Sequence, residues 1–266
     1  MSPLDSFDHP LTGRYASPEM QRLFSTGHRY TTWRRMWLAL AESERDLGLE
    51  IPAEAIEQMR ATLEVTEDDL ERVAEYEKRT RHDVMAHLEA FADHAPAARP
   101  VLHLGATSAF VGDNAELVIT RDALDLVITR VLATIDAMAR FAENWADEPT
   151  LGMTHFQPAQ PTTVGKRATL WLHELLLDLE RLRFERGRLK LRGAKGTTGT
   201  QATFLDLFGG DHAKVRELDR LVAEKVGFES CYPVTGQTYS RKVDAFVLDA
   251  LSGVAQSSAK LATDIR

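Results

Sequence analysis

The sequence contains a single cysteine, Cys231, and lacks any long run of apolar residues. One cysteine cannot form an internal disulfide, so we expect a reducing, cytoplasmic environment. No apolar run approaches the ~20 residues that a membrane-spanning helix requires, and residues 1–5 do not resemble the start of a secretory signal. Basic residues are in the minority, with 32 Lys and Arg against 40 Asp and Glu and a net charge of −8. This balance argues against nucleic-acid or membrane partners but leaves open a small anionic substrate.

Helical periodicity covers most of the first part of the chain. Three helices are predicted, over residues 17–47, 52–63 and 66–92, the last interrupted near 81–83. Ser17 and Thr66 are typical N-caps, and Gly48 is a typical residue just beyond a helix end. Residues 95–112 contain two prolines and two glycines and are expected to form a loop.

Three long helices are predicted in the second part. Asp113 and Glu116 have the spacing of a capping box, which places the start of the first. The second covers residues 163–190 and is apolar on nearly all sides, which predicts burial. The third begins near Tyr239 and shows no stop signal before Arg266, so we expect the sequence to be the N-terminal part of a longer protein. The pattern predicts an all-α fold, with a small N-terminal helical domain over 1–111 and a partial long-helix bundle over 112–266.

Between the first two long helices lies a polar segment, Thr154–Lys166, that two prolines interrupt. Pro158 and Pro161 lack amide donors and push the residues before them toward extended backbone, so this segment cannot be a helix. Extended backbone beside a helical core can aim polar side chains at a ligand. His155 is therefore the first candidate for a catalytic residue.

Five more polar loops separate the predicted helices, at residues 13–17, 80–83, 104–108, 193–201 and 235–242. Each loop alone has an ordinary interpretation as a turn, a surface contact or a flexible connection. The glycine-rich loop at 193–201 lacks the Gly-Lys-Ser/Thr ending of a phosphate-binding P-loop. His82 and His87 are five residues apart and would not share a helix face as zinc ligands do, so no metal site is predicted.

The motifs in these loops are more informative together. In chain order they are Arg-Tyr-Ala-Ser-Pro-Glu-Met from residue 14, Thr-Arg-His-Asp-Val from 80, His-Leu-Gly-Ala-Thr-Ser from 103, Thr-His-Phe-Gln-Pro-Ala-Gln from 154, Lys-Gly-Thr-Thr-Gly-Thr-Gln from 195, and Gly-Gln-Thr-Tyr-Ser-Arg-Lys-Val-Asp from 236. This set resembles the adenylosuccinate lyase family of the fumarase/aspartase superfamily, and the resemblance extends along essentially the whole chain.

The resemblance implies a β-elimination that releases fumarate from adenylosuccinate, giving AMP, and from the succinyl-aminoimidazole-carboxamide ribotide. It implies that His155 is the general acid. Substrate-binding positions carried over from the family are Arg14 and Tyr15 for the phosphate; Arg81, His82 and Asp83 for the nucleotide; and Thr107, Ser108, Thr154 and Gln237 for the succinyl group. A homotetramer is implied for the full-length protein, and neither a metal nor an organic cofactor is implied.

One family motif is absent from the 266 residues. The superfamily's general base is a serine in a mobile loop with the pattern Ser-Ser-x-Met-Pro-x-Lys-x-Asn-Pro. Without it, we expect this chain alone to be inactive. Two alternatives remain: argininosuccinate lyase or another fumarate-releasing relative, and a non-catalytic helical scaffold.

Overall fold

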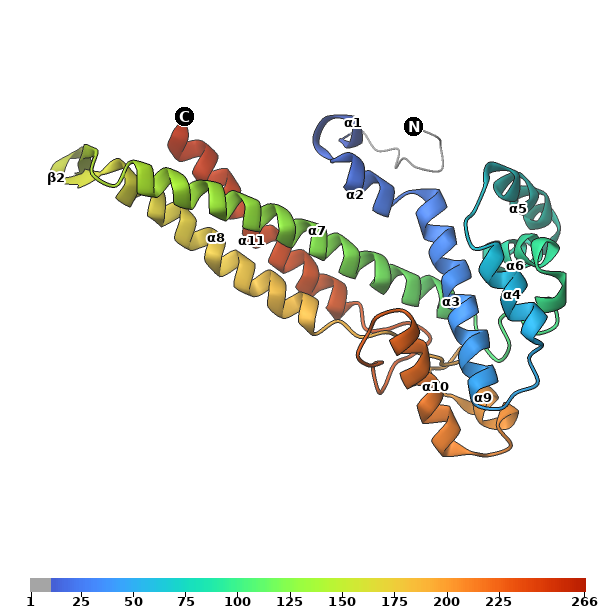
Figure 1. Cartoon of the computed structure of the whole chain (residues 1–266). Helices are drawn as coiled ribbons and strands as arrows, with labels where there is room; N and C mark the ends of the chain where they lie inside the picture. Colours follow the sequence, from blue (N-terminus) through green and yellow to red (C-terminus); the bar gives the residue numbers. More distant parts are fainter. Residues whose placement is uncertain (1–10) are drawn as a thin grey trace. The chain divides into compact units, whose positions relative to one another are not determined.

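The computed structural model describes residues 11–266, which form two compact units (Figure 1). Unit 1 comprises the described residues up to Asp122 together with Leu189–Ser240, and unit 2 comprises Ala123–Arg188 together with Arg241–Arg266. The predicted all-α fold is confirmed: within the described residues, regular structure other than helix is limited to one two-stranded hairpin and an isolated bridge. The division at residues 111 and 112 stays a prediction. No helix in the described part of the chain is long and apolar enough to cross a membrane.

Unit 1 is built from short and medium helices around α3. Its elements are α1 (Thr12–Tyr15), α2 (Pro18–Leu23), α3 (Thr26–Asp46), α4 (Ala53–Ala61), α5 (Glu67–Thr80), α6 (Asp83–His94), the 3-10 helix η1 (Pro96–Ala98), the start of α7 (Ala109–Asn144), α9 (Ala202–Leu207) and α10 (His212–Lys225). Met36, Trp37 and Leu40 of α3 are at most 1% exposed and contribute the centre of the core. Helix α3 contacts both α4 and α10, so the two segments of the chain that make up unit 1 share one core.

The single helix predicted over residues 17–47 is in fact two helices. Ser17 caps α2 as predicted, with its Oγ accepting a hydrogen bond from the amide of Met20. Helix α2 ends at Leu23, and Ser25 caps α3 by accepting from the amide of His28 at 3.2 Å. The apolar pattern continues across this break and hides it, although serine is a common N-cap. Gly48 follows the end of α3 with φ +97°, as predicted for a residue beyond a helix end.

The interruption predicted near residues 81–83 is confirmed. Thr66 and Asp69 form a capping box at the start of α5. Arg81 then adopts the left-handed conformation, with φ +52°, and ends that helix. Because α6 begins only two residues later, the turn between the helices presents Arg81, His82 and Asp83 together.

The predicted start of the first long helix, at Asp113, is wrong. Helix α7 begins at Ala109, so part of the loop expected over 95–112 is helical, and η1 occupies another part. Asp113 is buried within α7, and its Oδ2 accepts a hydrogen bond from the amide of Tyr239 at 2.8 Å. The carboxylate thus serves a segment far along the chain rather than its own helix end.

Unit 2 consists of long helices and a hairpin. It contains the rest of α7, β1 (Pro149–Thr154), β2 (Gln157–Thr163), α8 (Val164–Gly187) and α11 (Lys242–Ile265). Gly165 packs on the end of α7 so closely that a Cβ would lie 2.2 Å from the oxygen of Ala142. At the other end of α8, Arg186 pairs with Asp125 of α7 at 2.8 Å, so these helices run antiparallel. Helix α11 contacts α8 and begins at Lys242, three residues later than predicted (Figure 1).

The apolar surface of α8 is only partly covered within the chain. Leu175, Leu179 and Leu182 are at most 5% exposed. Leu170, Leu176 and Leu177 are 46–53% exposed, which contradicts burial on all sides within a single chain. The sequence pattern records how apolar the helix is, but not whether another part of the same chain covers each face.

Candidate active site

A pocket of about 450 Å³ in unit 1 brings three of the predicted substrate-binding residues together. Asp83 at the start of α6, Ser108 just before α7 and Gln237 before α11 all line it. These residues come from three separate motifs that are far apart in the sequence. Arg29 and Trp33 of α3 also line the pocket. The pocket therefore supports the grouping of these motifs into one site.

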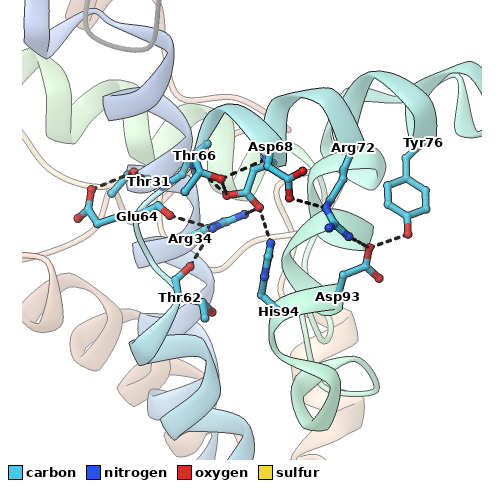
Figure 2. A network of polar contacts seen from close by, with 12 residues as sticks. Thr31, Arg34, Thr62, Glu64, Thr66, Asp68, Arg72, Tyr76, Asp93 and His94 are labelled. Atoms are coloured by element: carbon cyan, nitrogen blue, oxygen red, sulfur yellow. Dashed lines mark hydrogen bonds and ion pairs between the residues drawn. The ribbon is translucent and has the colours of Figure 1, made fainter. Parts of the chain in front are cut away.

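A polar network holds α5 and α6 against α3 and so fixes the turn that carries Asp83 (Figure 2). Nη1 of Arg34 donates to the main-chain oxygen of Thr62 at 2.8 Å, and Nη2 donates to Asp69 at 2.7 Å. The same carboxylate contacts Nε2 of His94 at 2.9 Å. Asp69 therefore connects α3, α5 and α6 at one point.

The turn itself has strong local constraints. The amide of Arg81 donates to the oxygen of Glu77 at 2.9 Å, and Nδ1 of His82 lies 3.3 Å from Oδ1 of Asp83. Oδ1 of Asp83 also accepts from the amide of Val84 at 2.7 Å. Arg81, His82 and Asp83 are exposed, as substrate-contacting residues need to be, but only Asp83 is among the residues that line the pocket.

An aromatic cluster backs the Trp33 wall. The ring of His87 lies 5.3 Å from that of Trp33 and 3.7 Å from that of Tyr30, measured between centroids. Burial lowers the pKa of His87 to about 4, so this imidazole is neutral at physiological pH. A neutral ring packs among aromatic groups without the desolvation cost of a charge, and His87 is therefore a packing residue of the wall.

The segment leading to Thr107 and Ser108 is anchored at two points. Nε1 of Trp37 donates to Nδ1 of His103 at 2.9 Å, which requires that Nδ1 carry no proton. Gly105 has φ +65°, and a Cβ there would lie 2.8 Å from Cδ1 of Leu207 in α9. The main-chain oxygen of Thr107 then accepts from the amide of Phe110 in the first turn of α7. Thr107 is half-buried beside Ser108 but is not a lining residue of the pocket.

Arg14 and Tyr15, predicted to bind phosphate, lie in the short helix α1. Both are exposed, and the guanidinium carbon of Arg14 lies 5.8 Å from the ring centroid of Tyr15. Neither lines the pocket of unit 1, so the structure does not bring them to the other candidate residues. Their role in phosphate binding stays a prediction.

Thr154 and His155 belong to unit 2, at the end of the β1–β2 hairpin. Strand β1 pairs antiparallel with β2, with Thr154 opposite Gln157. Pro158 and Pro161 lie in β2, where a two-stranded sheet leaves one edge free and tolerates a missing amide donor. The extended backbone predicted for this segment is confirmed over Gln157–Thr163, but the prediction is wrong for Val164–Lys166, which form the first turn of α8. His155 and Phe156 form the two-residue connection, both with positive φ, at +50° and +57°.

The pocket also contains residues that the sequence reasoning missed. Arg29 and Trp33 are four residues apart on one face of α3. Gly112 and Glu116 have the same spacing on α7. Because the helix was predicted to start at Asp113, Gly112 was assigned to a loop. With the helix starting at Ala109, Gly112 and Glu116 lie on the same face of α7.

Comparison with known proteins identifies the family. The sequence profile of the family described as "Lyase" matches residues 16–266. The chain belongs to the lyase family. Adenylosuccinate lyases of Saccharomyces cerevisiae and Schizosaccharomyces pombe are 53% and 54% identical to it, over all of this chain and 55% of each relative. The predicted resemblance to adenylosuccinate lyase is confirmed, and the chain spans about half the length of these relatives.

Solved structures with a similar fold agree with this family assignment. A fumarate lyase from Mesorhizobium sp. BNC1 aligns with a TM-score of 0.82 and 28% identity, over 96% of this chain and 58% of that one. A 3-carboxy-cis,cis-muconate lactonizing enzyme from Pseudomonas putida aligns with a TM-score of 0.81 and 25% identity, over 97% of this chain and 57% of that one. Across residues 11–266, no group of three or more His, Cys, Asp or Glu side chains is placed to hold a metal ion.

Proposed function

We propose that this chain is the substrate-binding and acid-supplying part of an adenylosuccinate lyase. The whole protein would release fumarate from adenylosuccinate and from the related succinyl-carboxamide ribotide. The observation that carries the proposal is the pocket of unit 1, which unites Asp83, Ser108 and Gln237 from three family motifs. The identity of 53% with the yeast adenylosuccinate lyase favours this substrate class over that of other fumarate-releasing enzymes.

The residue types suit the elimination. Cleavage of the C–N bond leaves an amine that departs readily only if it is protonated. A histidine side chain can donate that proton as a general acid, an effect of about 10²–10⁴ in rate, and His155 is the candidate for this role. Removal of the carbon-bound proton builds charge on the adjacent carboxylate, which fixed neutral donors stabilise. Ser108 and Gln237 carry such donors into the pocket.

The residue that removes the carbon-bound proton is not among these 266 residues, because they contain no serine-loop motif. We therefore expect no elimination by this chain alone. Arg14 and Tyr15 would bind the phosphate, since a guanidinium can donate two parallel hydrogen bonds to it. The whole protein is expected to act in the cytoplasm as a homotetramer.

The test is to express the chain alone and together with the C-terminal part of the Saccharomyces cerevisiae relative that it does not cover. Fumarate release from adenylosuccinate is followed by absorbance, and co-elution on gel filtration shows whether the two parts assemble. We expect activity in the assembled pair and none in the chain alone. Fumarate release by the chain alone would refute the missing-base argument, and an assembled pair that cleaves argininosuccinate instead would favour the other lyase.

A pair of histidine variants tests the acid. His155→Asn should lower kcat of the assembled pair by at least about a hundredfold, within the range for general acid catalysis. His212→Asn is the matched control, because His212 is an exposed histidine at the start of α10 in unit 1. Equal activity of both variants would remove His155 from the mechanism. Arg14→Ala should weaken ribotide binding without altering the affinity for a phosphate-free analogue.

A further inference from the structure

Arg192 is a fully buried arginine whose guanidinium binds main-chain oxygens of two loops. Its Nε donates to the oxygen of Gln237 at 2.6 Å. Its Nη1 donates to the oxygen of Lys195 at 2.7 Å, and its Nη2 donates to that of Gly196 at 2.9 Å. The planar guanidinium holds its donors in a rigid fork, so it fixes the directions of these carbonyl groups relative to one another. Arg192 therefore joins the glycine-rich loop to the segment that carries Gln237.

A glycine makes a second attachment between the same two segments. Gly199 has φ +79°, and a Cβ at this position would lie 2.0 Å from the oxygen of Thr235 and 2.7 Å from that of Gly236. Such distances leave no room for a side chain, so the two backbones are in direct contact. On the far side of Gln237, the amide of Tyr239 donates to Asp113 of α7. Gln237 thus lies between fixed points on both sides.

The glycine-rich loop is itself held on the core of unit 1. The Nζ of Lys195 donates to Oδ2 of Asp219 in α10 at 2.8 Å, and the amide of Ala194 donates to Oδ1 of the same residue at 2.7 Å. The amide of Gly193 donates to Asn114 of α7 at 3.0 Å. Burial raises the pKa of Asp219, while the Lys195 ammonium opposes that shift. These contacts fix the loop to α7 and α10, and the loop in turn fixes the backbone at Gln237.

The same contacts argue against a phosphate cradle in this loop. A cradle offers free backbone amides to the anion. Here the amides of Gly193 and Ala194 already donate to side chains, as described above. The amide of Gly196 donates to the oxygen of Thr200 at 2.7 Å, and that of Gly199 donates to Gly196 at 3.1 Å. These four amides are therefore already bonded within the protein and are not free to bind an anion.

We propose that Arg192 is a positioning residue. By binding both the glycine-rich loop and the main-chain oxygen of Gln237, it fixes the backbone at Gln237 so that the Gln237 side chain lines the pocket. The consequence for substrate binding rests on the proposed function, in which Gln237 contacts the succinyl group. The consequence for the backbone does not. An arginine replaced by lysine keeps the charge but donates from a single nitrogen and cannot span both loops.

The experiment compares Arg192→Lys with Arg121→Lys. Arg121 is the matched control because its Nη1 also donates to main-chain oxygens, those of Val226 at 2.7 Å and Gly227 at 3.2 Å, and it does not line the pocket of the candidate site. Hydrogen–deuterium exchange is measured on the chain as it is, without ligand. We expect Arg192→Lys to accelerate exchange at residues 235–239 at least tenfold, and Arg121→Lys to act only near residues 226–227. Unchanged exchange at 235–239 in a folded Arg192→Lys protein would overturn the proposal, as would equal acceleration by the control.

A pair of glycine variants tests the same coupling between the loops in case the arginine variant does not fold. Gly199→Ala should also accelerate exchange at 235–239, because its Cβ would overlap the oxygen of Thr235. Gly209→Ala carries the same cost of a positive φ, at +60°, but its Cβ would meet nothing within 4 Å. If Gly199→Ala leaves residues 235–239 as protected as Gly209→Ala does, the coupling between the loops is refuted.

A kinetic readout separates this proposal from the proposed function. In the assembled pair, Arg192→Lys should lower kcat/KM for adenylosuccinate at least tenfold, while Arg121→Lys should leave it within about twofold. Accelerated exchange in an assembled pair that does not cleave adenylosuccinate would refute the proposed function and keep the positioning role. An unchanged kcat/KM despite accelerated exchange would refute the link between Arg192 and the substrate.

Discussion

Arg34 and Asp69 form an ion pair at 2.7 Å in which the two side chains are only 4% and 2% exposed. The carboxylate also contacts His94 at 2.9 Å and closes the capping box with Thr66 (Figure 2). Burial alone would raise the pKa of Asp69, but hydrogen bonds from Arg34 and from the amide of Thr66 hold it below its usual value. The pair therefore ties α5 to α3, and with α5 the turn that carries Asp83.

Asp69→Ala should destabilise the chain strongly, because it leaves the Arg34 charge buried and unpaired. Breaking a buried pair in this way costs about 3–5 kcal/mol. The measurement is the free energy of unfolding from urea titration. Asp68→Ala is the control, since this neighbouring carboxylate is 62% exposed and pairs with Arg72 on the surface. It should cost less than about 1 kcal/mol. Similar losses in the two variants would mean that the buried pair does not support unit 1.

Local signals in the sequence located several helix boundaries. Ser17, Gly48 and Thr66 act at the helix ends where their side-chain chemistry or backbone freedom predicts. The prolines of the polar segment excluded a helix and left extended strands, as found. Two of the misplaced boundaries share a cause: apolar periodicity runs through Ser25 and begins before Asp113, so the pattern gave no boundary at either position.

The candidate site was only partly visible in the sequence. Asp83, Ser108 and Gln237 lie in motifs that resemble one family, and the structure places them around one pocket. Trp33 has no such motif, because its place in the wall depends on packing between helices distant in sequence. Arg192 was missed for a different reason. Its partners are main-chain oxygens, which every residue has, so no residue pattern marks them.

Two histidines, His87 (buried) and His103 (half-buried), should make stability fall in acid. Burial lowers the pKa of His87 to about 4, and burial, aided by the charge of His82, does the same for His103. In the unfolded chain both histidines have a pKa near 6.5, so between pH 6.5 and 4 the unfolded state binds more protons than the folded state. The stability is fully present above pH 6.5 and is lost as the pH falls toward 4, by up to about 3 kcal/mol for each histidine.

His103→Gln tests this linkage. A glutamine oxygen can still accept the hydrogen bond from Trp37, but it does not titrate in this range. The variant should lose less stability than the native chain between pH 7 and 5, by about 2 kcal/mol. His212→Gln, at an exposed position, should follow the native curve. The measurement is the free energy of unfolding at several pH values. Parallel plots of this free energy against pH for the native chain and His103→Gln would exclude the lowered pKa of His103.

Glu44 should produce the opposite dependence. Its side chain is fully buried in α3, and neither carboxyl oxygen has a hydrogen-bond partner among residues 11–266. Burial raises its pKa to about 9. Between the unfolded pKa near 4.5 and this value the folded state binds the extra proton, so stability falls as the pH rises. Glu44→Gln removes this titration and should gain about 3 kcal/mol at pH 7 relative to its effect at pH 4. Exposed Glu50→Gln should show no such gain, and an equal pH profile for both variants would contradict the assignment.

The connection of the hairpin should become more stable with glycine at Phe156. Phe156 has φ +57°, a conformation that costs a residue with a side chain about 1–2 kcal/mol. Its side chain is fully exposed, so Phe156→Gly loses no packing within the chain. Glycine's greater freedom in the unfolded chain offsets about 0.5–1 kcal/mol of the gain. We therefore expect slower hydrogen exchange across the β1–β2 pair. Thr150→Gly, within β1, offers no positive φ to relieve and should speed exchange instead. Faster exchange in Phe156→Gly would show that the phenylalanine stabilises the turn despite its φ.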